Sequence, residues 1–290
     1  MENAGNITSD MIEDQELFER FVNGGKKGSI ALPVPAANIT EWYGDRSPWT
    51  LVTGLSTVDM EKVIYYAGYL VVDPKDTYLT RGTILNEKDL AEAEKNYGEG
   101  SFAAAAGAEA IDSYLDEIGL NALYEQSREE ERACMKELTA AEDVVKDAAE
   151  YTEEQSLKES ELMKKLENIR ARIDACIYLV NNRDRFLIRN VRVFPLQMRP
   201  MVWEAANRTP YGIFHDLGSL YFSVAVHAER LQKLIDIKAP DVIVRNEKRL
   251  LQEYVDNLLA NGLRTKPKTK GDGVPLLCLR DIVLREIEFC

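Results

Sequence analysis

The stretch APDVIVRNEKRLLQEYVDNLLANG, residues 239–262, decides how this chain is read. Pro240 disfavours helix in the residue before it, and Asn261-Gly262 is a common helix stop, so the stretch predicts a helix between two breaks. A core helix has no use for the charged run Arg-Asn-Glu-Lys-Arg at residues 245–249, which we therefore expect at a surface. The apolar positions on one side of the helix are Val244, Leu251, Val255 and Leu258.

The preceding segment predicts a second helix of similar length. Asp216 is a residue type that commonly caps a helix, and the apolar residues after it step by four and three. Those residues are Leu217, Tyr221, Val224, Ala228, Leu231 and Ile235. Two such helices joined by a short turn predict an antiparallel coiled-coil hairpin over residues 216–262. With the stripes facing each other, we expect Arg245, Glu247, Arg249 and Gln252 to project outward.

A second helical hairpin is predicted upstream, because residues 121–180 are rich in helix formers and contain no proline. We expect two long helices joined near Tyr151-Thr152. The seam of the second helix is expected at Leu162, Leu166, Ile169, Ile173, Cys176 and Val180.

Shorter elements are predicted elsewhere. The ranges with helical patterns are 56–66, 86 or 87 to 97, and the segment that follows Gly100. Strand patterns occupy residues 69–73 and 186–194, and the segment from residue 31 is broken by prolines. The fold class is therefore mainly α with a few short β-strands.

Charge divides the chain into two unequal halves. Residues 1–160 carry a net charge of −19 and residues 161–290 a net charge of +6, so we expect any polyanion to meet the second half. The predicted organisation is a polar leader at 1–30, an acidic helical body at 31–200, a loop at 201–215, the hairpin at 216–262, and a basic loop with a C-terminal segment at 263–290.

Catalytic and metal-binding motifs do not stand out. The four cysteines form no CxxC pair, and HExxH and GxGxxG are missing, so we expect no cofactor, no metal site and no catalytic residue. The neighbours His215 and Asp216 do not face each other productively as part of a triad. No apolar run approaches the roughly 20 residues that span a bilayer, and the acidic N-terminus is unlike a signal peptide. We therefore expect a cytoplasmic protein without membrane contact.

Several motifs resemble one known family. VIVRNEKRLLQEYVDNLLANG, preceded by LIDIKAPD, is similar to the clamp-helix coiled coil of the bacterial DNA-directed RNA polymerase beta-prime subunit. STVDMEKVIYYAGYLVVDP, AGAEAIDSYLDEIGL and MRPMV resemble other segments of that subunit in the same order. The likeness runs from about residue 31 to residue 279.

The resemblance implies roles for particular residues. In that family the hairpin docks sigma factor, the lid loop before it helps to separate RNA from template DNA, and the rudder loop after it lies near the hybrid. The implied sigma contacts are Arg230, Arg245, Glu247, Arg249 and Gln252, with His227 and Tyr254 standing where the family has an arginine and an alanine. The implied nucleic-acid contacts are Arg208 in the lid-like loop and Arg264, Lys266, Lys268 and Lys270 in the rudder-like loop.

The resemblance also sets limits. The family's magnesium-binding Asn-Ala-Asp-Phe-Asp-Gly-Asp loop and its four-cysteine zinc site have no counterpart here. The implied function is therefore a non-catalytic part of an RNA polymerase large subunit, with sigma factor, other polymerase subunits, DNA and RNA as partners. The alternative is a stand-alone helical scaffold or sigma-sequestering protein derived from that subunit, which the changed residues 222–229 favour.

Overall fold

The computed structural model describes residues 28–98, 100–146, 153–194, 201–202, 213–214 and 216–288. Its helices are α2 (Ile39–Trp42), α3 (Pro48–Thr53), α4 (Thr57–Ile64), α5 (Glu87–Tyr97), α6 (Ala108–Ile118), α7 (Leu120–Lys146), α8 (Glu153–Asn182), α9 (Asp216–Asp236), α10 (Asp241–Ala260) and α11 (Leu279–Glu288), with a 3-10 turn, η3, at Arg183–Arg185. The strands are β1 (Ser29–Ala37), β2 (Tyr69–Asp73), β3 (Ile84–Leu85), β4 (Ala103–Ala105), β5 (Leu187–Arg192), β6 (Met201–Val202) and β7 (Ile213–Phe214). The predicted mainly helical fold is confirmed.

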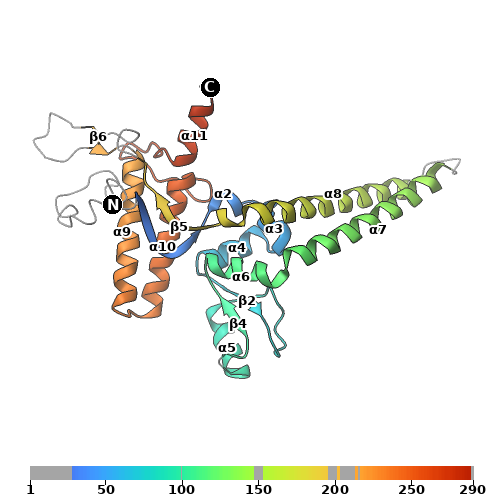
Figure 1. Ribbon diagram of the computed structural model, residues 1–290, viewed down its shortest axis with the longest axis horizontal. Coiled ribbons are helices and arrows are strands. Elements are labelled where there is room, and N and C mark those ends of the chain that lie inside the picture. Colours follow the sequence, from blue (N-terminus) through green and yellow to red (C-terminus); the bar gives the residue numbers. More distant parts are fainter. Residues whose placement is uncertain are drawn as a thin grey trace, which may run out of the picture.

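Three parts project from a central body (Figure 1). The α9–α10 hairpin lies at one side, the long α7–α8 pair extends away from it, and the small sheet β3–β2–β4 with α5 lies below. The body between them is the packing of α2, α3, α4 and α6 against the root of α8. Among the described residues, no helix combines the length and the apolar character that crossing a bilayer requires.

Local sequence explains where several helices begin. Ser47 caps α3 by accepting a hydrogen bond from the Thr50 amide, and Pro48 then occupies the first helical position, where its missing N–H costs nothing. Ser56 caps α4 and Asn86 caps α5 in the same manner. These caps account for the agreement of α4 and α5 with the predicted ranges.

The strand β1 lies in the Pro-broken segment, where the sequence analysis predicted no strand. It pairs antiparallel with β5, although Pro33 and Pro35 have no N–H to donate. The pairing is interrupted between Ala31 and Ala36, so the prolines sit where the ladder makes no bonds. Residues 1–27 of the predicted leader lie outside the described residues, and its end is part of β1.

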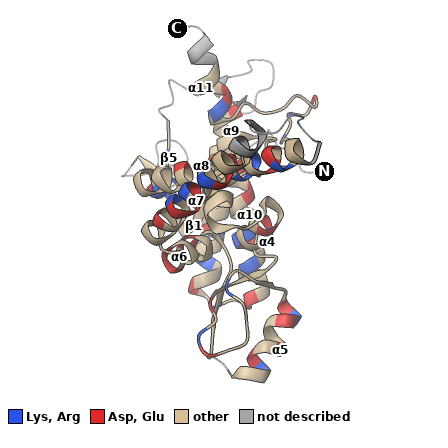
Figure 2. Cartoon of the chain, turned by 90° about the vertical axis from the view of Figure 1, so that its right-hand side faces the viewer, with Lys and Arg blue, Asp and Glu red and all other residues tan. Residues whose placement is uncertain are grey.

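The α7–α8 pair confirms the predicted second hairpin, whose connection lies outside the described residues. Cys134 and the seam residues Leu162, Leu166, Ile169 and Ile173 form one apolar cluster between the helices. A polar layer lies beside it, in which Arg172 donates to the buried Ser127 hydroxyl and Arg170 pairs with Glu131. Basic and acidic residues both occur on the two helices, which point toward the viewer in Figure 2.

The root of α8 departs from the predicted seam. Val180 is 60% exposed, whereas its neighbour Leu179 is fully buried in the body core. There Trp49 stacks on Phe186 with ring centroids 3.8 Å apart, and Leu179 belongs to the same cluster. Because α8 stops packing against α7 alone and meets α3, its buried face rotates by one residue.

The α9–α10 pair forms the predicted helical hairpin. Its core includes Tyr221, Val224, Leu231, Leu251 and Val255, which follow the predicted stripes. Ile235, predicted in the stripe, is instead partly exposed near the turn.

The shift at the root of α8 gives a paired test. Leu179→Ala should lower the free energy of unfolding by about 2–5 kcal/mol, because it empties a fully buried site. Val180→Ala, at the adjacent exposed site, should change it by less than about 0.5 kcal/mol. Urea unfolding followed by circular dichroism measures both, and equal losses would restore the predicted seam.

Candidate interaction site

The turn between α9 and α10 is built from local sequence. The amides of Ile237 and Ala239 bond back to Lys233 and Leu234, and Lys238 adopts a left-handed conformation with φ of 51°. Pro240 is the N-cap of α10, and Asp241 places a carboxylate in the first turn, where the helix dipole favours negative charge. The predicted turn is confirmed, and it directs α10 back along α9.

Glu247 is buried, with only 2% of its surface exposed, so the expectation that it projects outward is wrong. Its carboxylate lies 2.6 Å from His227 Nδ1 and 3.4 Å from Arg230 Nε, both on α9. Position 247 falls three residues after Val244 and four before Leu251, which is a stripe position. The heptad spacing therefore contained the signal that the charge of Glu247 concealed.

The ring of His227 stacks on Tyr254 of α10. Their centroids are 4.1 Å apart with an interplanar angle of 20°, and the ammonium of Lys268 lies 5.1 Å from the Tyr254 ring. Arg230 follows one turn later, and 62% of its side chain is exposed. The structure thus brings together four sequence-predicted residues, His227, Arg230, Glu247 and Tyr254, and joins Lys268 to them.

Gln252 is also buried, at 3% exposure, which corrects a second outward prediction. Its carboxamide accepts a bond from the Ala37 amide at 2.7 Å and donates to the Ala37 carbonyl at 2.8 Å. It also donates to Asp256, one turn further along α10. Gln252 therefore fastens α10 to the end of β1 and is not available to a partner.

Asp256 and Tyr65 were missed by the sequence reasoning. The Tyr65 hydroxyl donates to the Asp256 carboxylate at 2.6 Å, and Arg264 covers the Tyr65 ring at 3.7 Å. Burial raises the pKa of Asp256 to about 7, against the lowering effect of its bonds from Tyr65 and Gln252. The only signal in sequence was that Asp256 follows Gln252 by four residues and so shares its face.

Arg245 and Arg249 have partners within the chain. Arg245 donates to the Tyr69 hydroxyl at 2.7 Å and pairs with Glu87 at 3.0 Å, so it joins the hairpin to the small sheet. Its side chain is mostly covered, contrary to the prediction. Arg249 pairs with Glu253 at 2.7 Å and remains partly exposed, as predicted.

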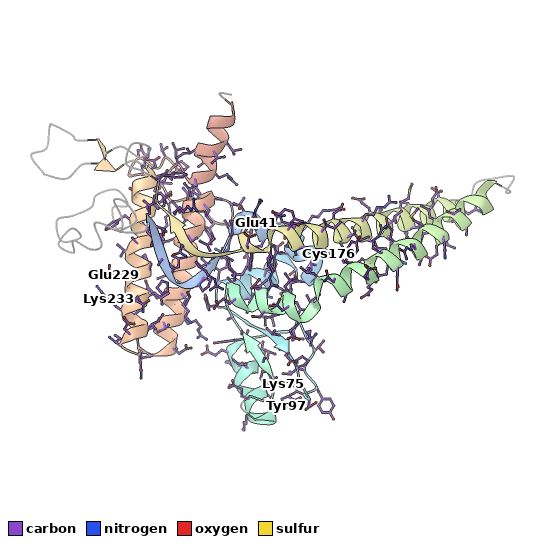
Figure 3. The ribbon with its side chains drawn as sticks, in the orientation of Figure 1. Glu41, Lys75, Tyr97, Cys176, Glu229 and Lys233 are labelled. Carbon is purple, nitrogen blue, oxygen red and sulfur yellow. The ribbon has the colours of Figure 1, made fainter. Side chains whose placement is uncertain are left out.

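The outer side of α9 carries a further ion pair. Glu229 and Lys233, labelled in Figure 3, lie one turn apart on the side facing away from the body. Their charged atoms are 2.6 Å apart. The pair balances its own charge, and Arg230, next to Glu229 in sequence, is a further exposed cation on this part of α9.

The basic loop is folded onto the root of the hairpin. The Asn261 side chain bonds to the backbone of Lys268 and Leu276, and Lys270 pairs with Asp216 at 2.9 Å. Arg264 is held by Tyr65 and lies 3.5 Å from Glu61. Lys266 and Lys268 are the exposed cations of the loop with no carboxylate partner shown among the described residues. Arg208 and His215 lie outside the described residues.

Metal chemistry finds no support in the part of the chain that the structure describes. No group of three or more His, Cys, Asp or Glu side chains there is arranged to hold an ion. Cys134, Cys176 and Cys278 are buried free thiols, and burial raises the pKa of Cys176 and Cys278. The arrangement is one of positioned charges and rings on a rigid helical hairpin.

Comparison with known proteins identifies the class. A family model described as RNA polymerase Rpb1, domain 1, matches residues 15–283, so the chain belongs to that family. The chain is similar to the DNA-directed RNA polymerase subunit beta′ of Clostridium tetani, with 36% identity, of Alkaliphilus oremlandii, with 35%, and of Clostridium acetobutylicum, with 37%. Each alignment spans 270 residues and 92% of this chain. The chain spans about a fifth of the length of these relatives, 20–21%. The resemblance to the beta-prime subunit is confirmed.

Asp256 generates a prediction about pH. Its raised pKa means that the folded state holds this proton more tightly than the unfolded chain, where the ordinary value is 3.8. The resulting stabilisation is complete below the ordinary value and is lost as the pH rises through about 7. Asp256→Asn should remove this component, because an amide can accept from Gln252 and donate to Tyr65 without titrating.

Urea midpoints of the wild-type and Asp256→Asn proteins from about pH 4 to 8 provide the measurement. The difference in unfolding free energy between the two proteins should change across this pH range. The change should be about 1.4 kcal/mol for each unit by which the pKa of Asp256 differs between the folded and unfolded states. Asp236→Asn, an exposed carboxylate that accepts a bond from Gln232, is the matched control. Parallel curves for the wild-type and Asp256→Asn proteins would show that Asp256 titrates normally.

Proposed function

We propose that this chain is a non-catalytic part of a DNA-directed RNA polymerase large subunit and that its α9–α10 hairpin docks a sigma factor. Family membership and the names of its relatives support the polymerase role in transcription. Other polymerase subunits are then its constant partners, and the cytoplasm is its location. The docking role rests on the geometry of the hairpin.

The observation that carries the docking proposal is the state of Arg230. Its side chain is 62% exposed, yet its Nε is held 3.4 Å from the buried carboxylate of Glu247. Holding one edge of a guanidinium orients its remaining donors, which can then bind a partner carboxylate with little further loss of side-chain entropy. Arg230 is therefore a prepared anchor on the outside of a rigid hairpin.

The remaining predicted sigma contacts divide into two kinds. Arg249 is partly exposed and supplies a second cationic contact, competing with its own Glu253. Glu247, Gln252 and Arg245 act as positioning residues, because their side chains are engaged within the chain. His227 and Tyr254 contribute the rings between the anchor and the basic loop.

The basic loop is proposed to contact DNA or RNA without sequence preference. Lys266 and Lys268 carry this role, because Arg264 and Lys270 are bound to groups of the chain. Arg208 is proposed as a further nucleic-acid contact from the lid-like segment. The number of phosphates that the rudder-like loop neutralises is accordingly smaller than its four cations suggest.

Arg230 and Arg249 give the test of sigma docking. Arg230→Ala should weaken binding to the host's primary sigma factor at least about tenfold, because truncating one partner of a desolvated charge pair at an interface costs roughly 2–5 kcal/mol. Arg249→Ala should weaken binding less, since Glu253 already satisfies part of its charge. Titration calorimetry with the full chain measures both affinities.

Arg189→Ala is the matched control, because Arg189 lies on β5, is 59% exposed and pairs with Glu109. It should bind sigma factor like the wild type. Glu247→Lys is unsuitable, because it would replace a buried carboxylate with a buried cation next to Arg230 and disturb the fold. Equal affinities for Arg230→Ala and Arg189→Ala would reject sigma docking by the hairpin. In a separate pull-down with the full chain, failure to recover other polymerase subunits would favour the stand-alone scaffold.

The salt dependence of nucleic-acid binding tests the basic loop. With two contacts, the log–log slope of affinity against salt for a mixed-sequence single-stranded DNA should be about −1.4. The double variant Lys266→Ala/Lys268→Ala should lose most of this slope, while Lys88→Ala/Lys95→Ala, on exposed α5, should keep it. Fluorescence anisotropy over a salt series measures the slopes, and a slope unchanged by the first pair would remove the loop from the interface.

A further inference from the structure

A chain of contacts links the middle of the hairpin to the basic loop. Arg230 and His227 both meet the carboxylate of Glu247, at 3.4 and 2.6 Å. His227 stacks on Tyr254 at 4.1 Å, and Lys268 lies 5.1 Å from the Tyr254 ring. Two surfaces that the sequence assigned to different partners are therefore contiguous.

The charge of this surface is positive at both ends. The guanidinium of Arg230 is exposed at one end and the ammonium of Lys268 at the other. Glu247 is buried, and its carboxylate contacts His227 and Arg230. A complementary ligand carries carboxylates at its two ends and a planar or apolar group between them, over the rings.

We propose that Arg230, the His227–Tyr254 ring pair and Lys268 form one docking surface for an acidic segment of the protein partner. This inference rests on the proposed sigma docking and extends it, because it gives Lys268, a proposed nucleic-acid contact, a second role in the protein interface. Tyr254 becomes a positioning residue that couples Lys268 to the hairpin.

The rings favour a protein segment over a nucleic acid at this place. Binding of unpaired bases relies on open aromatic faces on which they stack. Here the two rings stack on each other, and only 15% of the His227 side chain is exposed. Each ring covers one face of the other and Lys268 lies close to the Tyr254 ring, so the surface suits the carboxylates and side chains of a peptide better than bases.

Lys266 provides an internal control, because it is an exposed lysine of the same loop, two residues before Lys268, with no ring contact shown. Lys268→Ala should weaken binding to the primary sigma factor about fivefold or more, whereas Lys266→Ala should change it less than about twofold. Both variants should lower affinity for single-stranded DNA to the same extent. Titration calorimetry and anisotropy with the full chain measure the two affinities.

Tyr254 supplies the second line of the test. Tyr254→Phe keeps the ring, so in that background Lys268→Ala should still weaken sigma binding more than Lys266→Ala does. In a Tyr254→Ala background, Lys268→Ala should weaken sigma binding no more than Lys266→Ala does. If Arg230→Ala weakens sigma binding but Lys268→Ala behaves like Lys266→Ala, the extended surface is wrong and the docking proposal stands. If Arg230→Ala has no effect, the docking proposal itself fails. Loss of DNA binding alone in Lys268→Ala would assign that lysine to the nucleic acid.

Discussion

The arrangement of this protein depends on the hydrogen bonds between the Gln252 side chain and both backbone groups of Ala37. A carboxamide has a donor and an acceptor side by side, so it can replace a neighbouring strand where β1 ends. The two residues are 215 positions apart, and the bonds are buried. Truncating Gln252 would leave the amide and the carbonyl of Ala37 without partners, at a cost well above that of a surface hydrogen bond.

The Gln252–Ala37 contact connects segments that lie far apart in the sequence. Ala37 of β1 pairs with Leu187 of β5, the strand that follows the α7–α8 pair. The Gln252 side chain of α10 therefore connects the α9–α10 hairpin to the β1–β5 sheet. Asp256, one turn after Gln252, accepts a hydrogen bond from Tyr65, and Arg264 of the basic loop lies over the Tyr65 ring. The hairpin can act as a rigid docking element because its root is fixed by buried polar groups, which tolerate far less displacement than an apolar contact.

Sequence patterns predicted the elements better than the fates of the charged residues. Apolar periodicity placed α9 and α10 because the stripes are local, and β2 was placed by its β-branched run before Pro74. Glu247 was misplaced because its charge outweighed its stripe position, although the spacing indicated burial. Arg245 could not have been placed at all, since its partners Tyr69 and Glu87 are more than 150 residues away in sequence.

The same limit applies to the seam of α8. Periodicity carried the pattern to Val180, but the partner of the helix changes where α3 and Phe186 replace α7, and only tertiary packing reveals that change. Likewise the four cations of the rudder-like loop looked equivalent in sequence. Asp216, Tyr65 and Asn261 distinguish them in space, because each holds one part of the loop.

The charged run at residues 245–249 is therefore not a continuous partner-binding face, because several of its side chains have partners within the chain. Arg245 faces the small sheet, Glu247 faces α9, and Arg249 is balanced along its own helix. Internal compensation of this kind weakens long-range attraction to arbitrary polyanions, because paired charges produce little field beyond a Debye length. The exposed cations that remain are Arg230, whose ion pair is with the buried Glu247, and Lys266 and Lys268 of the basic loop, while Lys248 lies over the Tyr66 ring. A partner must match the few exposed cations to gain affinity. Because the other charges are paired within the chain, they attract unmatched polyanions only weakly, and this difference makes the hairpin selective.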